Sequence, residues 1–591
     1  MLLACALLSV ACSTQDAPPP LKDLVGSGAE AVKRLVPSSD QVTVSRKLRG
    51  LIVSIQPGRD EYPGIALKPP HASWDLSSHG HIEARLVNTG SEPLTLTLRV
   101  DNAGDWKDNP WDAENVTLAP GEAGTITTIF GYSYGHKPSY ALKPSAVTNL
   151  MLFTSKTDKP LSFRLVSVSV AGPANEQPAV APEDVRVKPA DGLLLGVDTR
   201  TTQEGGMTTL RPHVGRWDLR DFLEVRIRLR NDDTVAVSPR VRLESNGGLS
   251  NWQAVPPLPP GNEADVVIPF SGDGPVDLTK KDTGSHVTSD SISAVTVDSG
   301  NAGQKGLLRV ASLQAILPPP PALPTWLGSR PPVEGAWVKT LDDEFNDPAL
   351  DASHWSVYGP NYWDKQTHWS RNDVLLGGGV MKLRYEKKTG FGNDDPTQKP
   401  SDYAAGYLHT YGLWRQRYGY FEARMKLPTT PGLWPGFWMM PDRGPEVGPE
   451  QWRRQDTGNG GMEFDIMEHL TRWGRFRYNI AMHYDGYGKD QKQLGSDKTY
   501  VRPDKDGFIT CGLLWTPGLA TYYCNGQEVL RWKDTRVSNV PGIVMFTLPE
   551  GGWDNSALDE TKLPADFVID YVRIWQRRDL ASSVDGVLPR H

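Results

Sequence analysis

The sequence predicts an all-β protein built from three antiparallel sandwiches, two small modules followed by one larger domain. Short runs in which apolar and polar residues alternate, such as "IEARLV" and "VRIRLR", recur along the chain between turn residues. Glycine and proline are frequent, at 57 and 49 of the 591 residues, as expected for many turns. The length also fits three or four domains of ~150 residues each.

The N-terminal segment has features of export. The run "MLLACALLSVAC" is too short to span a bilayer. Residues 1–12 resemble a bacterial lipoprotein signal, which would be lipidated at Cys12, so we expect an exported chain, secreted or anchored at the cell envelope. No lysine or arginine precedes Lys22, although a signal peptide has a basic start. Either translation begins upstream, or this is a disordered N-terminus with an incidental cysteine. Residues 13–40 are polar and contain prolines, which predicts a tether with a short helix near "AEAVKRLV".

Two copies of one module follow. Residues 64–88 and 207–231 align with an offset of 143 and share six pairs: Leu67/Leu210, Pro69/Pro212, Trp74/Trp217, Asp75/Asp218, Leu76/Leu219 and Asn88/Asn231. Together with the alternating runs, this repeat predicts two tandem β-sandwich modules at 41–171 and 187–315. The Pro-rich segment after the first module, and residues 316–336 after the second, are expected to be semi-rigid spacers.

The tryptophans of the modules allow two interpretations. Trp106, Trp111 and Trp252 lie in loop-like segments and would be able to stack on sugar rings. Trp74 and Trp217 repeat at one position, which favours a role in the core. The alternative is that the modules only hold the C-terminal domain away from a membrane.

The C-terminal domain is expected at 337–577, with a tail at 578–591. It contains thirteen of the nineteen tryptophans and alternating runs such as "YGYFEARMKL" and "FVIDYVRIW". No long stretch has the 3.6-residue period of a helix. An antiparallel sandwich with a curved, grooved sheet is therefore predicted.

The segment "NGGMEFDIMEHLTRWG" places three carboxylates in an otherwise apolar strand. Glu463 and Asp465 have even spacing and point to one face. Glu468 has odd spacing, so a regular strand would turn it to the other face. One extra residue in a β-bulge between Asp465 and Glu468 would return it to the same side, and bulges are frequent beside active sites.

Three acids on the floor of a wet cleft suit glycoside hydrolysis. Like charges at short distance split their pKa values, which leaves one carboxyl ionised and one protonated. Retaining glycosidases use such a pair, about 5–5.5 Å apart, as nucleophile and as general acid/base. Acidic triplets also occur on solvated faces and in metal sites. The apolar neighbours Met462, Phe464 and Ile466 argue against a solvated ribbon.

Five segments of this domain resemble glycoside hydrolase family 16: "DDEFND", "RYGYFEARMKLPTTPGLWPGFWMMPD", "MEFDIMEHL", "GLLWTPGLATYYCNGQEV" and "FVIDYVRIWQ". The resemblance implies a β-jelly-roll fold. It also implies that Glu463 is the nucleophile and Glu468 the general acid/base, with Asp465 between them tuning protonation.

Further residues are candidates for substrate contact. Trp434 and Trp438 in "GLWPGFW" would offer flat rings to sugars. The resemblance places a cleft histidine at His483, for which a structural role is the alternative. Trp553 would form a loop platform. Arg472, with its basic neighbours Arg475 and Arg477, would bind sulfate or other acidic groups, or would lie in a solvated turn.

The resemblance also implies a structural calcium that involves Glu344 and Asp570, since oxygen ligands suit Ca²⁺; no other cofactor is expected. Cys511 and Cys524 lie in a predicted hairpin and are expected to face each other. Either a disulfide or two buried free thiols fits this placement.

The expected function is a retaining endo-β-glycanase that acts on a polysaccharide, either a laminarin-type β-1,3-glucan or a red-algal galactan. The chain carries 63 basic and 70 acidic residues, for a net charge of −7, and no basic block, so no nucleic-acid partner is indicated. We expect a monomer. A non-catalytic glycan-binding protein is the first alternative, and the three carboxylates argue against it. A cell-wall transglycosylase would use the same trio and stays open.

Overall fold

The computed structural model describes residues 22–581, apart from residues 27–28, 48–49, 105–110, 119, 132–141, 176–192, 196–198, 202–206, 211–215, 281–283, 301–307, 362–363, 365 and 552–556. The predicted signal with Cys12, and the residues Trp106 and Trp553, lie outside the described residues. The chain divides into two compact units, residues 1–185 with 211–216, and residues 186–210 with 217–591.

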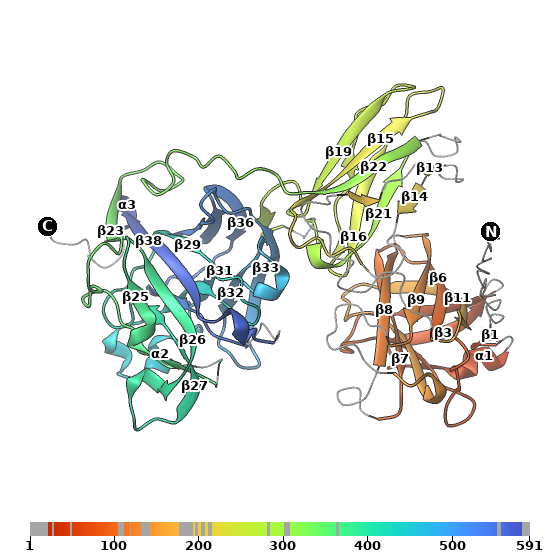
Figure 1. Ribbon diagram of the computed structural model, residues 1–591, viewed down its shortest axis with the longest axis horizontal. Helices are drawn as coiled ribbons and strands as arrows, with labels where there is room; N and C mark the ends of the chain where they lie inside the picture. Colours follow the sequence, from red (N-terminus) through yellow and green to blue (C-terminus); the bar gives the residue numbers. More distant parts are fainter. Residues whose placement is uncertain are drawn as a thin grey trace, which may run out of the picture. The chain divides into compact units, whose positions relative to one another are not determined.

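The first unit contains the first predicted module, a sandwich of two antiparallel sheets (Figure 1). One sheet consists of β1 (Lys22–Asp23), β3 (Val42–Lys47), β4 (Gly50–Ile55), β6 (His81–Asn88), β9 (Ala123–Ile129) and β11 (Leu161–Ala171). The other consists of β2 (Leu35–Pro37), β5 (Gly64–Leu67), β7 (Leu94–Asp101), β8 (Trp111–Leu118) and β10 (Asn149–Phe153).

This module begins earlier than the sequence indicated. Strand β1 pairs with β11, the helix α1 (Ala29–Arg34) follows at the expected place, and β2 pairs with β5. Leu24, Val25 and Leu35 are buried in the module core. The prediction of a tether over 13–40 is therefore wrong from residue 22 onward, because these three apolar side chains belong to the sandwich.

The second module, in the second unit, is also a two-sheet sandwich. Its first sheet consists of β12 (Leu193–Leu195), β13 (Thr199–Thr201), β15 (Glu224–Asn231), β19 (Glu263–Pro269) and β22 (Leu308–Ile316). Its second sheet consists of β14 (Met207–Leu210), β16 (Arg240–Ser245), β17 (Gly248–Leu249), β18 (Gln253–Ala254) and β21 (Ile292–Asp298).

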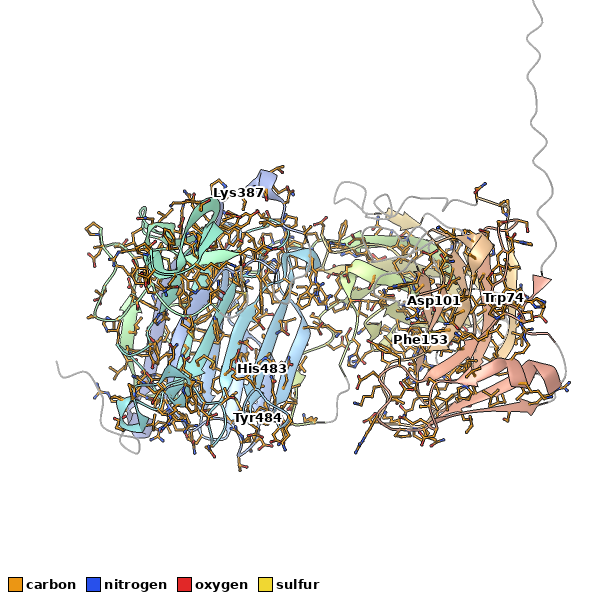
Figure 2. All side chains as sticks on the ribbon, turned by 90° about the horizontal axis from the view of Figure 1, so that it is seen from below. Trp74, Asp101, Phe153, Lys387, His483 and Tyr484 are labelled. Atoms are coloured by element: carbon orange, nitrogen blue, oxygen red, sulfur yellow. The ribbon has the colours of Figure 1, made fainter. Side chains whose placement is uncertain are left out.

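The repeat noted in the sequence makes equivalent contacts in both modules. Asn88 donates to the carbonyls of Glu92 and Leu118, and Asn231 donates to those of Val235 and Leu258. The two repeated tryptophans are buried, as expected for core residues; the first of them, Trp74, is labelled in Figure 2. Repeated residues thus form the turns and cores that the two copies share.

The C-terminal domain is a larger sandwich. An eleven-stranded sheet contains β20 (Val276–Asp277), β23 (Trp337–Asp343), β24 (Thr367–Trp369), β25 (Val374–Leu376), β26 (Met381–Phe391), β27 (Pro400–Ala405), β29 (Gly419–Lys426), β34 (Ile509–Thr516), β35 (Leu519–Cys524), β36 (Gln527–Lys533) and β38 (Ala565–Arg577). A six-stranded sheet has the order β28 (Tyr407–His409), β37 (Gly542–Thr547), β30 (Gly436–Pro441), β31 (Glu463–Glu468), β32 (Arg477–Tyr484) and β33 (Lys492–Tyr500). Two one-turn helices, α2 (Gln451–Arg454) and α3 (Arg578–Ala581), complete the domain. The all-β prediction is confirmed.

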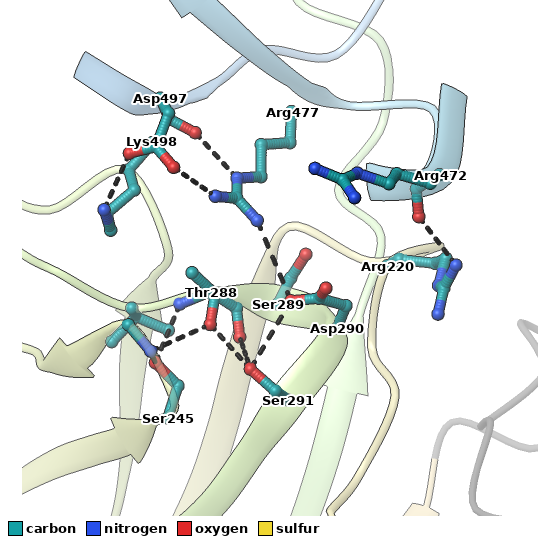
Figure 3. A network of polar contacts seen from close by, with 12 residues as sticks. Arg220, Ser245, Thr288, Ser289, Asp290, Ser291, Arg472, Arg477, Asp497 and Lys498 are labelled. Atoms are coloured by element: carbon teal, nitrogen blue, oxygen red, sulfur yellow. Dashed lines mark hydrogen bonds and ion pairs between the residues drawn. The ribbon is translucent and has the colours of Figure 1, made fainter. Parts of the chain in front are cut away.

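The second module is joined to this domain by more than the chain connection. Its strand β20 pairs in parallel with β36, at the edge of the larger sheet. Arg477 of β32 lies 3.8 Å from Asp290 of the module and 2.6 Å from Asp497 of β33 (Figure 3). Tyr500 Oη accepts from the Ser289 backbone N–H at 2.9 Å.

The Pro-rich segment 316–336 also contacts the domain: Arg573 Nη1 donates to the Gly328 carbonyl at 2.7 Å. Among the described residues, no helix has the length and hydrophobicity that crossing a membrane requires.

Candidate active site

The three carboxylates of β31 meet on one face because of a bulge. On one side, Phe437 and Trp438 of β30 are neighbours, yet they pair with Met467 and Asp465, which are two apart. On the other side, Asp465 pairs with Ala481 and Glu468 pairs with Asn479, so three steps on β31 match two on β32. The extra residue lies between Asp465 and Glu468, as predicted.

The face that carries the acids lines a cleft. Phe464 points the other way, since its ring lies 5.1 Å from that of Trp515 in the larger sheet. The cleft has a volume of about 360 Å³, and it is lined by Trp434, Gly436, Trp438, Glu463, Asp465, Glu468, Asn479, His483, Tyr487, Gln491, Gln493, Thr547 and Pro549. Strands β30, β31 and β32 supply most of these residues, so the rigid sheet positions the site.

Glu468 is held by two N–H donors. Trp434 Nε1 donates to its Oε1 at 2.9 Å, and Asn479 Nδ2 donates to its Oε2 at 2.6 Å. Burial raises the pKa of Glu468 well above its usual range, and the charge of Asp465 raises it further, against the two hydrogen bonds. Glu468 is thus a fixed carboxyl that tends to hold a proton.

Glu463 lies at the start of the strand, where it accepts a hydrogen bond from the Tyr487 hydroxyl. Burial among protein atoms raises the pKa of Glu463 well above its usual range, and the charges of Asp465 and Glu468 add to this effect. Because the carboxylates of Glu463 and Glu468 repel each other, the site disfavours the state in which both are ionised.

Asp465 lies between the two glutamates and is 3% exposed. Its Oδ2 lies 3.3 Å from His483 Nε2, and no described residue donates a hydrogen bond to this buried oxygen. The other ring nitrogen of His483 contacts Gln491 Nε2 at 3.3 Å. Among the described residues that line the cleft, His483 is the one that can carry a positive charge.

The structure places the predicted substrate-contact residues as follows. Trp434, Trp438 and His483 line the cleft, and Trp438 also donates to Thr547 Oγ1 at 3.2 Å. Arg472 is not among the described lining residues. It lies in the short 3₁₀ helix η7 (Thr471–Trp473), where its carbonyl accepts from Arg220 of the second module at 2.7 Å (Figure 3).

Arg472 and Arg477 thus contact the second module, which corrects the expectation that they would bind the substrate, while Arg475 is exposed. Arg477 is 4% exposed and stacks 4.2 Å above the Trp473 ring. It is neither a sulfate site nor part of a solvated turn, because Asp497 and Asp290 occupy its guanidinium.

Sequence reasoning missed several lining residues, namely Asn479, Tyr487, Gln491, Gln493 and Thr547. One signal was available for Asn479, which is four residues before His483 on the same strand and therefore shares its face. Tyr487 and Gln491 lie beyond the end of β32 in a turn region, where alternation gives no direction.

The two carboxylates expected to bind calcium each have an arginine partner. Glu344 accepts two hydrogen bonds from Arg573, at 2.7 and 2.8 Å, and Asp570 accepts one from Arg424 at 2.6 Å. A cation at either carboxylate would compete with a guanidinium, so these residues do not fit a preformed calcium site.

The two cysteines of the hairpin lie directly opposite each other, as expected. Cys511 of β34 pairs with Cys524 of β35, and both buried thiols are free, with their sulfur atoms 3.4 Å apart. Of the module tryptophans, Trp252 has the guanidinium carbons of Arg240 and Arg242 each 4.6 Å from its ring centroid, so a sugar would have to displace an arginine there.

Comparison with known proteins identifies the domain that carries the cleft. The model of the family "Glycosyl hydrolases family 16" matches residues 363–573. Residues 363–573 form a family 16 glycoside hydrolase domain. This places the chain among the glycosidases.

Relatives of the family 16 domain act on several polysaccharides. A β-glucanase of Rhodothermus marinus is 26% identical over 41% of this chain and 85% of its own length. A β-porphyranase C of Zobellia galactanivorans is 24% identical over 44% of this chain and 83% of its own length. The chain spans about half the length of several other curated relatives that it matches.

Among solved structures, the catalytic domain of an endo-1,3-β-glucanase (laminarinase) from Thermotoga petrophila is 21% identical. The match covers 42% of this chain and all of that chain, with a TM-score of 0.35.

Proposed function

We propose that the protein is a retaining endo-β-glycanase that hydrolyses internal β-glycosidic bonds of a polysaccharide. The observation that carries the proposal is the bulge in β31, which brings Glu463, Asp465 and Glu468 to one cleft wall. Repulsion between Glu463 and Glu468 favours one protonated and one ionised glutamate, and double displacement needs one protonated acid and one ionised nucleophile.

In the first step, protonated Glu468 donates its proton to the glycosidic oxygen as the bond to the leaving sugar breaks. The Glu463 carboxylate attacks the anomeric carbon and forms a glycosyl ester. In the second step, Glu468 removes a proton from water, the water attacks the same carbon, and Glu463 is released. The division of roles between the two glutamates follows the family resemblance.

The surrounding side chains support this sequence of steps. Trp434 and Asn479 orient Glu468 and stabilise its ionised form after proton transfer, through hydrogen bonds to charge worth about 1.5–3 kcal/mol each. The Tyr487 hydroxyl stabilises ionised Glu463 in the same way. Asp465, close to both glutamates, keeps their pKa values raised.

For the substrate we propose a neutral β-glucan of the laminarin type. The described lining residues include no lysine or arginine. They offer aromatic rings, amides and hydroxyls, which recognise the faces and hydroxyls of neutral sugars. A sulfated galactan would call for cationic partners, and the predicted one, Arg472, lies elsewhere.

The test is a polysaccharide panel. The full chain and its Glu463→Ala variant are incubated with laminarin, lichenan, agarose and porphyran, and the products are sized. We expect mid-sized oligosaccharides from laminarin and none from the variant. Cleavage of porphyran alone would show that the substrate is a galactan and not a glucan. Transfer products without net hydrolysis would indicate a transglycosylase. Equal cleavage by wild type and variant would refute the assignment of Glu463 as the nucleophile.

A further inference from the structure

We propose that Glu463, Asp465 and His483 form a binding site for a divalent transition-metal ion such as Zn²⁺, and that this ion inhibits the enzyme. One ligand atom from each residue lies within 4.8 Å of the other two. Glu463 and His483 are directly paired across β31 and β32, so two adjacent strands of a rigid sheet hold the set.

A second observation independently points to a ligand. Asp465 is 3% exposed, and its Oδ2 is buried without a hydrogen-bond donor among the described residues. This oxygen belongs to the cluster and lies 3.3 Å from His483 Nε2. An unsatisfied buried carboxylate oxygen is costly, and a cation between these atoms would satisfy it.

The donor set selects the class of metal. Two carboxylates and one imidazole, with a fourth position open to the cleft, resemble the three-ligand zinc sites of metalloenzymes, whose bonds are about 2.0–2.2 Å long. Such bonds put neighbouring ligand atoms ~3.3–3.5 Å apart, a spacing that Asp465 Oδ2 and His483 Nε2 already have. The Glu463 oxygen lies within 4.8 Å of both and would move toward them by rotation of its side chain. Imidazole favours Zn²⁺, Cu²⁺ or Ni²⁺ over Mg²⁺ and Ca²⁺.

The neighbouring residue Gln491 fits a metal-bound histidine. A ligating imidazole usually donates its other ring N–H to a nearby acceptor, which fixes its orientation. Gln491 lies 3.3 Å from His483 Nδ1, and its amide would present oxygen to that N–H after rotation by half a turn. The sheet thus supplies the three ligands, and the turn before β33 supplies the orienting group.

The consequence for activity rests on the proposed function. An ion on Glu463 occupies the lone pairs that attack the anomeric carbon, and it lies where the sugar ring binds. Metal and polysaccharide therefore compete, so Zn²⁺ raises the apparent KM while kcat at saturating substrate is unchanged. Metal binding can be measured whether or not the protein cleaves a polysaccharide.

The experiment measures binding directly on the untagged full chain after treatment with EDTA. Calorimetry with Zn²⁺ and the visible spectrum with Co²⁺ should show one site with nitrogen and oxygen ligands. Affinity for Zn²⁺ should fall at least tenfold in His483→Ala and in Asp465→Asn. Glu344→Gln, which changes a carboxylate paired with arginine, serves as the matched control and should bind as the wild type does.

Two outcomes would overturn the site: no stoichiometric binding of Zn²⁺, or equal binding in His483→Ala, Asp465→Asn and wild type. The Asp465→Asn variant keeps the side-chain shape, so a folding failure of His483→Ala leaves the test intact. If the polysaccharide panel shows no cleavage while binding behaves as expected, the proposed function fails and the metal site stands. Binding without competition against substrate would refute the inhibition.

Discussion

Strands β31 and β33, which flank β32 in the family 16 domain, carry acidic side chains that differ in whether cations lie beside them. Glu463, Asp465 and Glu468 line the cleft, with only His483 as a nearby potential cation among the described lining residues. On β33, Asp497 contacts Arg477 and Lys498, at 2.6 and 2.7 Å. Burial alone would raise the pKa of Asp497, but these two cations lower it below its usual range.

The difference separates carboxyls that do chemistry from carboxyls that hold structure. Without a cationic partner, the buried glutamates Glu463 and Glu468 have raised pKa values and destabilise the fold at neutral pH. With cations, similar acids are ionised and connect elements. Asp290 belongs to the second group and ties the second module to β32.

The first module does not have this acid. The 3₁₀ helix Pro144–Ala146 before its Trp74–Val147 bridge corresponds to the 3₁₀ helix Ser289–Ser291 before the Trp217–Ile292 bridge. The central residue is Ser145 in one copy and Asp290 in the other. The copies therefore share their core and differ at the position that contacts the catalytic domain.

The largest expected effect is on activity, when an acid without a cationic partner is removed. Glu463→Gln should lower the rate of polysaccharide cleavage on the order of 10⁴-fold or more, since the covalent step is lost. Its melting temperature should not fall, because a repelling charge is removed. Glu344→Gln is the matched control. It loses the pair with Arg573, so it should melt at a lower temperature and cleave within about twofold of wild type. Equal losses of activity would erase the distinction between the groups.

The next effect is on stability. Arg477→Ala leaves Asp497 and Asp290 without their shared cation, and the free energy of unfolding should fall by about 3 kcal/mol, the lower end for buried pairs because both acids are partly exposed. Arg475→Ala, two residues away and exposed, should change it by less than about 0.5 kcal/mol. Urea unfolding of the two variants, monitored by tryptophan fluorescence, measures both free energies of unfolding. Similar free energies of unfolding for both variants would show that the contacts of Arg477 with the second module contribute little to stability.

A smaller effect concerns the general acid. Asn479→Ala removes a donor that favours ionised Glu468, so the pKa of Glu468 rises further. Because cleavage needs the protonated acid, the alkaline limb of kcat/KM should move to higher pH, and kcat should fall about tenfold. Trp434→Phe should move the limb in the same direction. An unchanged limb in both variants would mean that another group supplies the proton.

The smallest effect is the pH dependence of stability. The pKa of Glu463 is raised in the folded state above 4.5, so wild type loses stability as pH rises past 4.5, by about 1.4 kcal/mol for each pKa unit. Glu463→Gln should therefore gain in melting temperature at pH 7 relative to wild type, and this gain should vanish near pH 4.5.

Asp497→Asn should behave in the opposite way. The pKa of Asp497 is lowered, so its stabilisation is present above pH 3.8 and is lost as pH falls through the folded-state pKa. The variant should be less stable than wild type at pH 7 and equal to it in acid. If the melting temperatures of the two variants, relative to wild type, changed with pH in the same direction, the distinction between the two groups of acids would be contradicted.

Local pattern was enough to predict the sheets and the bulge. Alternation fixes which face a side chain takes, so the odd spacing of Glu468 already required an extra residue. The repeat likewise identified both modules. These features depend on neighbours in the sequence, which a single chain displays.

Contacts between distant segments were not predictable in this way. From the sequence, Arg477 looked like a cation in a loop. Asp290 is remote in sequence, and Asp497 lies on a strand whose register the sequence does not give. Leu24 and Leu35 looked like tether residues, since nothing local shows that their partners are in β11 and β5, respectively. The Tyr487 hydroxyl reaches Glu463 from a turn, where no period applies.

The central claim is that Glu463 forms a covalent bond to the sugar. An activated 2-deoxy-2-fluoro glucoside, extended by one β-1,3-linked glucose, slows the second step and should trap this ester. Peptide mass spectrometry of the inactivated full chain should find one adduct, on Glu463. An adduct on Asp465 or Glu468, or turnover that releases the inverted anomer without any adduct, would contradict the account.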